Sequence, residues 1–527
     1  MGRIVATHRA LEPFADRPLT SEPASLPLAP VKDDSAIHEE RLSGGDVRRR
    51  AIAGVATVGA RGLMVRGLGL LGTIVLAHLL APRDFGLIAL GFTIVSVGGF
   101  LSSGGFGAAL IRQRATPSRE ELEAVLGLQL LVTLALCVVV AAVGIPLGKA
   151  GAVAALMVLS LPIDATRGPT GIALERTLSY RPIMIAEVTE MLAYNVFAVA
   201  AVIAGAGVWG VAAAVVVRAV VGALILFRLG PLGFVRPRLS WARVRPIFGF
   251  GVSFQAVQLV NLVRDQGVNI VTAAVAGFTV LGFWSMAWRL LQAIFLLFES
   301  LWKVSMPAMA RMLDAGEAVK PVLERALLLT AVLTGVMVVP LAGTAHSLVP
   351  VLFGDNWSGT IDVLPWAALA LVLNGPLSTV ATGYFYAINR PGVILRMVTV
   401  HSVVWFVVFV PLLPSMGAEA IGVGLLAAAV SDLVVLGVPL HRTAGVAVLK
   451  VTLVPIVAAV AASAVGTLVS ERLGPNLGGL VAALMCTELA FIGLIFVAKR
   501  SALADVARLS RRGLSGMVRV PEPAGVA

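Results

Sequence analysis

Long apolar stretches fill most of this chain and decide what it can fold into. Between residues 51 and 497 there are thirteen or fourteen runs of about 20 apolar residues, each long enough to cross a bilayer core of roughly 30 Å as a helix. Hydrophobic residues make up 58% of the chain and charged residues 13%, whereas a soluble domain needs about a quarter charged residues to cover its surface. The sequence therefore predicts an all-α integral membrane protein with about 14 transmembrane helices.

The distribution of positive charge predicts the topology. The chain has 41 Lys and Arg residues against 29 Asp and Glu residues, a net charge of +12. With a cytoplasmic N-terminus, the loops on that side hold clusters such as 112–119 and 236–245, and the opposite loops hold only Arg83, Lys149 and Arg472. This asymmetry follows the positive-inside rule and predicts that both termini are cytoplasmic. Because the basic residues do not form one contiguous face, we expect no nucleic acid partner.

The same pattern divides the chain into six segments. They are a cytoplasmic tail (1–50), an N-terminal six-helix lobe (51–229), a basic cytoplasmic linker (230–246), a C-terminal six-helix lobe (247–440), an additional helix pair (441–498) and a basic cytoplasmic tail (499–527). The first tail is rich in Pro, Ser and acidic residues and lacks the apolar core of a signal peptide, so we expect it to be disordered.

The two lobes show weak self-similarity. Residues 81–86 and 277–282 each form a short outer turn that ends in Gly, between the first and second helix of a lobe. Many transporters build two bundles around a central site from repeated halves of this kind. The repeat therefore favours a transporter.

Several segments also match the motifs of a known family. They are 78–90 (HLLAPRDFGLIAL), 105–112 (GFGAALIR), 281–290 (LGFWSMAWRL), 351–357 (VLFGDNW) and 386–392 (YAINRPG). Over about residues 50–440, the chain resembles the Wzx-like polysaccharide or oligosaccharide flippases of the multidrug/oligosaccharidyl-lipid/polysaccharide exporter superfamily. The resemblance implies two six-helix lobes related by a pseudo-two-fold axis, which open alternately to either side, and an additional C-terminal helix pair.

The resemblance also implies a function. Such a flippase would move a polyprenyl-diphosphate-linked oligosaccharide from the inner to the outer leaflet of the bacterial cytoplasmic (inner) membrane by alternating access. The glycan would serve exopolysaccharide, capsule or lipopolysaccharide biosynthesis. The expected partners are the lipid-linked oligosaccharide, membrane lipids, and a polysaccharide polymerase and export proteins. No cofactor is expected, and coupling to a proton or a sodium ion stays open.

Arginines inside the predicted helices are the leading candidates for substrate binding. A charge in the membrane is costly unless it faces protein or a water-filled cavity. Arg donates bidentate hydrogen bonds to phosphate oxygens and stays charged, so a cavity rich in Arg suits a diphosphate. The residues that we expect to bind substrate are Arg61, Arg66, Arg264 and Arg289. A structural alternative stays open, in which Arg264 pairs with Asp265 and Arg61 extends to the headgroup region.

Three carboxylates are candidates for ion coupling, because a carboxylate in a cavity can change protonation or ligate a cation as the lobes move. They are Asp265, Glu299 and Asp432. Each also has a structural explanation. Asp265 would neutralise Arg264, Glu299 would pair with Lys303 one turn later, and Asp432 would pair locally.

The sequence lacks the motifs that are typical of metal-binding proteins, ATPases and hydrolases. His78 and His401 have no second ligand at metal spacing on the same helix, which predicts packing roles and no metal. There is no phosphate-binding loop and no nucleophile elbow, so we do not expect an enzyme. Two alternatives stay open. An ion-coupled exporter of small cationic compounds would prefer an acidic cavity, and a membrane glycan polymerase or ligase would need a large outer loop, whereas the longest one predicted is 346–360.

Overall fold

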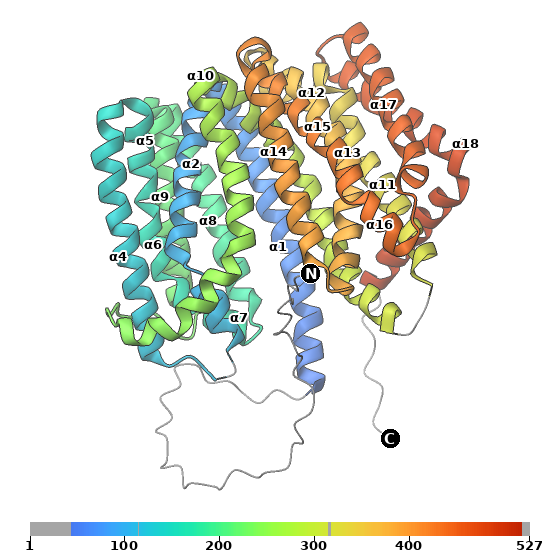
Figure 1. Cartoon of the computed structure of the whole chain (residues 1–527). Coiled ribbons are helices and arrows are strands. Elements are labelled where there is room, and N and C mark those ends of the chain that lie inside the picture. Colours follow the sequence, from blue (N-terminus) through green and yellow to red (C-terminus); the bar gives the residue numbers. More distant parts are fainter. Residues whose placement is uncertain (1–43, 114, 315–317, 519–527) are drawn as a thin grey trace, which may run out of the picture.

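The computed structural model describes residues 44–113, 115–314 and 318–518. Within these residues the chain is built from helices and contains no β-strand, which confirms the predicted all-α fold. Most of the helices lie roughly side by side, as expected for a chain that crosses a membrane many times (Figure 1).

The N-terminal half forms a bundle at one side of the molecule (Figure 1). Its helices are α1 (Gly44–Leu79), α2 (Pro82–Ser103), α3 (Phe106–Arg112), α4 (Arg119–Gly144), α5 (Lys149–Val158), α6 (Ser160–Thr166), α7 (Gly168–Arg176), α8 (Tyr180–Ala201) and α9 (Val208–Leu229). A capping box starts α4, because the Ser118 hydroxyl accepts a hydrogen bond from the Glu121 N–H and the Glu121 carboxylate accepts one from the Ser118 N–H. Within the bundle, α8 packs against α1 and α9, and α2 packs against α5.

A long helix, α10 (Trp241–Asp314), follows and doubles back on itself. If straight, its 74 residues would be roughly 110 Å long, several times the thickness of a bilayer core. Gly277 interrupts it with φ 84° and ψ 176°, a conformation open to glycine because it has no Cβ. Figure 1 shows the chain turning back at the end of the molecule where α10 is labelled. α10 therefore holds two of the predicted spans, one on either side of Gly277.

The C-terminal half contains the remaining helices. They are α11 (Val319–Gly343), α12 (Ala345–Phe353), α13 (Ser358–Ala387), α14 (Pro391–Met416), α15 (Ala418–Val435), α16 (Gly437–Ala444), α17 (Val448–Leu473) and α18 (Leu477–Val518). α13 packs against α10, α11 and α15, and α14 packs against α15. The additional pair, α17 and α18, packs against α11 on the side away from the N-terminal half (Figure 1).

The surface of these helices suits a lipid environment. Among the described residues, thirteen segments are long and apolar enough to cross a membrane, and one of them, Gln258–Gln292, runs through the reversal at Gly277. Large apolar side chains face outwards, as shown by Leu63, Val138 and Val497, which are 66%, 68% and 85% exposed. A surface this apolar is stable in the hydrocarbon core of a bilayer and unfavourable in water. The chain is a multi-pass membrane protein.

The two expected tails differ in part from the prediction. Residues 44–50, which we expected to be disordered, belong to α1. The basic segment after residue 498 continues as helix to Val518, with a break at Lys499 (φ −144°, ψ 53°). The rest of both tails, 1–43 and 519–527, lies outside the described residues.

The basic linker is attached to the N-terminal half. It is not helical before Trp241, and its Arg238 N–H donates a hydrogen bond to the Glu123 carbonyl at 3.0 Å. Arg243 forms an ion pair with Glu120 in the first turn of α4. These contacts tie the start of α10 to the same end of the N-terminal bundle as the start of α4.

The two self-similar turns lie against each other. A Cβ added to Gly86 would collide with the backbone oxygen of Phe278, and a Cβ added to Gly282 would collide with the backbone oxygen of Pro82. The contact is therefore reciprocal, as a two-fold relation between the halves predicts. Because both positions are Gly, the two backbones approach closely at the end of the molecule where α10 reverses.

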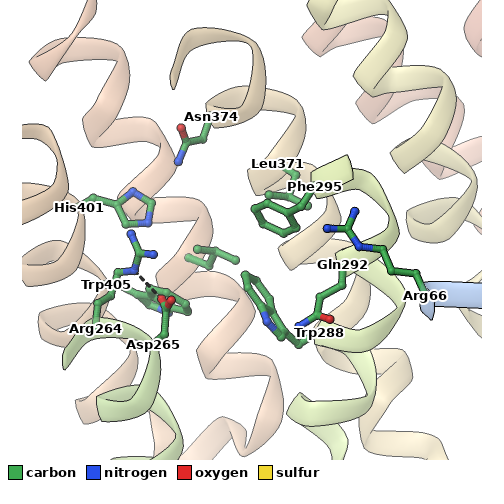
Figure 2. Close-up of a pocket in the computed structure, with 11 residues that line it drawn as sticks. Arg66, Arg264, Asp265, Trp288, Gln292, Phe295, Leu371, Asn374, His401 and Trp405 are labelled. Carbon is green, nitrogen blue, oxygen red and sulfur yellow. Dashed lines mark hydrogen bonds and ion pairs between the residues drawn. The ribbon is translucent and has the colours of Figure 1, made fainter. Parts of the chain in front are cut away.

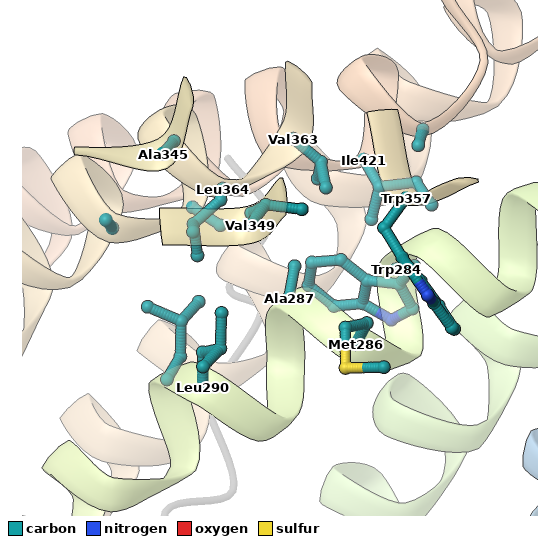
Figure 3. Close-up of a cluster of buried hydrophobic side chains, with 14 of the residues drawn as sticks. Trp284, Met286, Ala287, Leu290, Ala345, Val349, Trp357, Val363, Leu364 and Ile421 are labelled. Carbon is teal, nitrogen blue, oxygen red and sulfur yellow. The ribbon is translucent and has the colours of Figure 1, made fainter. Parts of the chain in front are cut away.

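Trp357 fills the neighbouring part of this contact. It ends the short 3-10 turn η3 (Asp355–Trp357) and is fully buried. Its indole N–H donates a hydrogen bond to the Ala77 carbonyl of α1 at 3.2 Å, and its ring packs edge-on against Phe85 at 4.9 Å between centroids. Figure 3 shows Trp357 in the buried cluster that α10 shares with α12 and α13. The predicted outer loop 346–360 is thus a short helix followed by a buried contact between the halves.

Candidate functional site

A cavity of about 460 Å³ lies between the two halves (Figure 2). It is formed by α1 from the N-terminal half and by α10, α13, α14 and α15 from the C-terminal half. The lining residues are Arg66, Arg264, Asp265, Trp288, Gln292, Phe295, Leu371, Asn374, His401, Trp405 and Leu425. All but Phe295 lie within segments that are apolar enough to cross a membrane, so the cavity opens within the depth of the bilayer.

Two of the predicted arginines reach this cavity, from opposite sides (Figure 2). Arg66 comes from α1, and Arg264 comes from the first half of α10. Arg264 Nε donates a hydrogen bond to Asp265 Oδ1 at 2.7 Å, so the pair that we left open as the structural alternative is present. The Arg264 and Asp265 side chains are 23% and 43% exposed, so a ligand can reach them. Each of the two guanidinium groups can donate hydrogen bonds to the oxygens of an anion.

A histidine and a carboxylate are paired beside the same cavity. His401 lines it from α14, and its Nδ1 lies 2.7 Å from Oδ2 of Asp432 in α15. Their side chains are 5% and 0% exposed, and Asp432 Oδ1 has no hydrogen-bond partner among the described residues. Of the other ion-coupling candidates, Asp265 lies in the cavity. Glu299 lies in α10, but its side chain is outside the part of the chain whose side chains are described.

Arg289 is not in the lining of the cavity. Its NH1 donates a hydrogen bond to Thr73 Oγ1 at 3.0 Å, and its guanidinium lies over the Phe85 ring at 5.7 Å from the centroid. Both partners belong to the N-terminal half, so Arg289 joins the two halves near the contact made by Trp357. A cation–π contact and a hydrogen bond help a buried guanidinium to be tolerated. Its role in substrate binding stays a prediction.

Arg61 is also outside the lining. It pairs with Glu187 of α8 at 3.1 Å, and the two side chains are 29% and 34% exposed. Glu175 of α7 belongs to the same group of charges, because burial raises the pKa of its carboxyl and the positive charge of Arg61 acts to lower it. Arg61 is therefore engaged by acids within the N-terminal half, and its predicted contact with substrate stays a prediction.

A second ion-pair network in the N-terminal half was not predicted from the sequence. Arg167 pairs with Asp164 at 2.9 Å and with Glu190 at 2.6 Å. Gly222 of α9 leaves the space, because a Cβ there would collide with Glu190 and Arg167. Glu190 lies in the middle of α8 and is buried. Pairing across helices of this kind has no local signal in the sequence.

Aromatic residues that the sequence analysis did not single out form one wall of the cavity. The Trp288 and Phe295 ring centroids are 5.4 Å apart, and Trp284 lies 5.4 Å from Trp288 and 6.0 Å from Trp405. Residues 284, 288 and 295 share one face of α10, since they are separated by one and by two turns. That spacing could have pointed to the wall, but the same spacing describes an ordinary buried face of a helix.

Comparisons with known proteins agree with this architecture. A family model described as polysaccharide biosynthesis protein matches residues 75–362, which is more than half of the chain. The chain belongs to this polysaccharide biosynthesis protein family. The matched region contains Arg264, Asp265 and Arg289, whereas Arg66 precedes it and His401 follows it.

Two relatives of the chain have names that refer to polysaccharide biosynthesis. The chain is 26% identical over 318 residues to the succinoglycan biosynthesis transport protein ExoT of Rhizobium meliloti (strain 1021), a match that covers 58% of this chain and 63% of the relative. It is 24% identical over 330 residues to the lipopolysaccharide biosynthesis protein WzxC of Escherichia coli (strain K12), with 60% and 66% covered. The chain thus spans just under two thirds of the length of these relatives. The resemblance to Wzx-like flippases is confirmed.

Solved structures show the same fold. The lipid II flippase MurJ in an inward closed conformation superposes with a TM-score of 0.62 at 14% identity, over 84% of this chain and 99% of that one. An inward-facing multidrug resistance MATE family transporter of the MOP superfamily superposes with a TM-score of 0.51 at 16% identity, over 73% and 95%. At these identities the likeness concerns the fold alone.

Proposed function

We propose that this protein is a flippase that moves a polyprenyl-diphosphate-linked oligosaccharide from the inner to the outer leaflet of a bacterial cytoplasmic membrane. The observation that carries the proposal is the cavity between the halves, at membrane depth, with Arg66 on one side and Arg264 on the other. The family membership and the transport names of the two relatives support a role in polysaccharide biosynthesis.

The charge of the cavity favours this cargo over a cation. Arg264 keeps donors free for a ligand, because its pair with Asp265 uses Nε and leaves the two terminal nitrogens of the guanidinium. A diphosphate offers several oxygens that can accept bidentate hydrogen bonds from such groups. A cationic compound, the alternative cargo, would lie beside the guanidinium groups of Arg66 and Arg264, and the repulsion disfavours it.

The contacts between the halves support alternating access as the mechanism. Arg289, Trp357 and the two glycine turns join the halves at the outer end, so opening to the outside requires these contacts to part. The cavity lies between the same two halves. A rocking motion of one half against the other would therefore expose the cavity to one leaflet and then to the other.

We also propose that the His401 and Asp432 pair couples transport to a proton. An isolated buried carboxylate is costly, and a neighbouring imidazole can share or release a proton as the surroundings change. The pair is 2.7 Å long and touches the cavity through His401. Movement of α14 and α15 during the cycle would change its access to water. A sodium ion is the alternative, for which a carboxylate would serve as ligand.

The test uses purified protein in liposomes that contain a polyprenyl-diphosphate-linked oligosaccharide with an NBD label on the glycan. Dithionite added outside reduces label in the outer leaflet, so movement between leaflets appears as loss of the protected fluorescence. We expect loss of nearly all the label with the protein and of about half without it, because half of the lipid starts in each leaflet. Protected label equal to that of protein-free liposomes would contradict the proposal. Efflux of a cationic dye from the same liposomes would replace it with the exporter alternative.

A further inference from the structure

One wall of the cavity has a composition that binding of a diphosphate does not explain. Trp288 and Phe295 of α10 face the cavity, and their ring centroids are 5.4 Å apart. Trp284, which is only 4% exposed and not in the lining, packs against Trp288 at 5.4 Å. Trp405 of α14 contacts Trp284 at 6.0 Å and also lines the cavity. The rings that face the cavity are thus held in place by other rings, and they form a preorganised aromatic wall.

Two amides accompany the aromatic wall. Gln292 lies one turn after Trp288 on α10 and is exposed in the cavity lining. Asn374 reaches the cavity from α13 (Figure 2), and its Oδ1 is buried without a hydrogen-bond partner among the described residues. At the next residue, Gly375, the Phe298 ring lies directly against the α13 backbone, since a Cβ there would collide with it. A buried amide oxygen without a partner calls for an explanation, and a bound ligand that donates a hydrogen bond supplies one.

We infer that the aromatic wall and its two amides form a subsite for a sugar ring of the cargo, an inference that rests on the proposed flippase function. A sugar ring has C–H groups on its faces and hydroxyl groups around its edge. The C–H hydrogens carry partial positive charge and are attracted to the negative face of an aromatic ring. The hydroxyl groups can satisfy the amides of Gln292 and Asn374. Apolar rings with a few well-placed polar groups are also the usual composition of a site of this size.

Other ligands fit this wall less well. A polyprenyl chain would bring only apolar groups and leave the amides of Gln292 and Asn374 unsatisfied. A cation would gain attraction from the faces of Trp288 and Phe295, but it would lie in a cavity that also holds Arg66 and Arg264. A neutral ring with hydroxyl groups has neither disadvantage. The wall would therefore recognise the glycan, and the arginines would recognise the diphosphate.

The experiment compares two ligands on the purified full chain in nanodiscs. One is polyprenyl diphosphate without sugar, and the other is the same lipid carrying a single hexose, tested with glucose and with galactose. For the wild type, we expect at least one hexosyl lipid to bind roughly tenfold more tightly than the bare lipid, the equivalent of about 1.4 kcal/mol.

Substitutions then test whether the aromatic wall causes the tighter binding of the hexosyl lipid. Trp288→Leu keeps an apolar side chain without a ring face, so we expect affinity for the hexosyl lipid to fall roughly tenfold while affinity for the bare lipid changes by less than about twofold. Asn374→Ala should act in the same direction. Trp288→Phe keeps a ring face and should retain most of the preference, which also shows that position 288 tolerates substitution. Trp209→Leu is the matched control, since Trp209 is 40% exposed on α9 and not in the lining.

The outcomes separate the subsite from the function on which it rests. Equal affinity of the wild type for the bare and both hexosyl lipids would overturn the subsite and leave the flippase proposal standing. The subsite would also be overturned if Trp288→Leu lowers the affinity for both lipids by the same factor, or lowers neither affinity. If the wild type binds no diphosphate lipid at all, the proposed function fails, and the subsite fails with it.

Discussion

At the scale of single residues, two arginines face one cavity from different helices. Arg264 is oriented by a 2.7 Å hydrogen bond to Asp265, its neighbour in sequence, whereas Arg66 approaches from α1 on the opposite side (Figure 2). The two come from different halves of the molecule. A ligand that binds both must therefore bridge the halves, so each arginine should contribute to transport and not only to folding.

The first prediction concerns Arg66. Arg66→Ala should lower the flipping rate per molecule by roughly tenfold or more, because a charged hydrogen bond to phosphate is worth about 1.5–3 kcal/mol. Arg66→Lys should restore part of the rate, since Lys keeps the charge but lacks the planar fork. The NBD assay in liposomes measures this at equal protein content. Arg472→Ala, which changes an exposed arginine in the last turn of α17, is the control. Normal rates for Arg66→Ala would exclude Arg66 from substrate binding.

The second prediction concerns proton coupling at Asp432. In wild-type proteoliposomes, a pH difference across the membrane should change the flipping rate. Asp432→Asn should abolish that dependence, because the amide no longer takes up or releases a proton. His401→Gln should weaken it while keeping a hydrogen-bonding group. Asp355→Asn, an exposed acid at the outer end, should behave as wild type. A wild-type rate that follows a sodium gradient and ignores pH would refute proton coupling.

Residue type alone predicted part of this site. Arg66, Arg264 and Asp265 could be found because a charge inside an apolar helix is costly and must face a cavity or a partner. The same argument could not separate Arg66 from Arg289, which meets Thr73 and Phe85 of the other half instead. That choice depends on which helices meet in space. The aromatic wall was missed for a related reason, since Trp and Phe residues in an apolar helix look the same whether they face a cavity or a core.

At the scale of elements, the outer turns and η3 control how the halves meet. The sequence predicted that residues 81–86 and 277–282 are equivalent turns, and the structure adds that they touch through Gly86 and Gly282. The sequence predicted a loop at 346–360, where the structure has α12 and the buried Trp357. An apolar outer segment is ambiguous in sequence, because its burial is decided by a distant helix.

The third prediction is that enlarging this contact opens it. Gly282→Ala adds a methyl group where the Pro82 backbone lies, and overpacking of this kind costs about 1–3 kcal/mol. A cysteine replacing Leu76, which is 4% exposed, should then react roughly tenfold faster with an impermeant thiol reagent added outside. Trp357→Ala should act in the same direction by removing the ring between the halves.

The control for the third prediction is a glycine with free space. A Cβ added to Gly493 of α18 would meet no atom within 4 Å. Gly493→Ala should leave the reactivity at position 76 unchanged. Equal reactivity in the Gly282 and Gly493 variants would show that the glycine turns do not hold the outer end closed.

At the scale of the whole molecule, the distribution of charge predicts which loops lie on which side of the membrane, and this sidedness stays a prediction. The all-helical membrane fold that the sequence predicts is also the fold of the solved structures that the chain resembles. Sequence could not predict how the halves pack, since a lipid-exposed face and a buried face are both apolar. Val138 and Val153 illustrate the point, because the first is 68% exposed and the second is fully buried.

The fourth prediction is the sidedness of the loops. In a background with Cys137 and Cys486 replaced by Ser, Asn356→Cys should be labelled by an impermeant reagent on intact cells. Leu239→Cys, which lies in the basic linker at a position 66% exposed, should be labelled only after the membrane is opened. The reverse pattern would invert the topology and with it the direction of transport.

The division of the cavity between two halves has a kinetic consequence. Arg66 belongs to one body, and the aromatic wall with Arg264 belongs to the other. A cargo bound by both halves is a bivalent ligand. While the distance between the halves stays constant, binding to one half raises the effective concentration of the cargo at the other half. When they rock apart, that advantage is lost without any change in the single contacts, and dissociation accelerates. Release would then be timed by the geometry of the motion, and the protein would not need weak binding in order to let its cargo go.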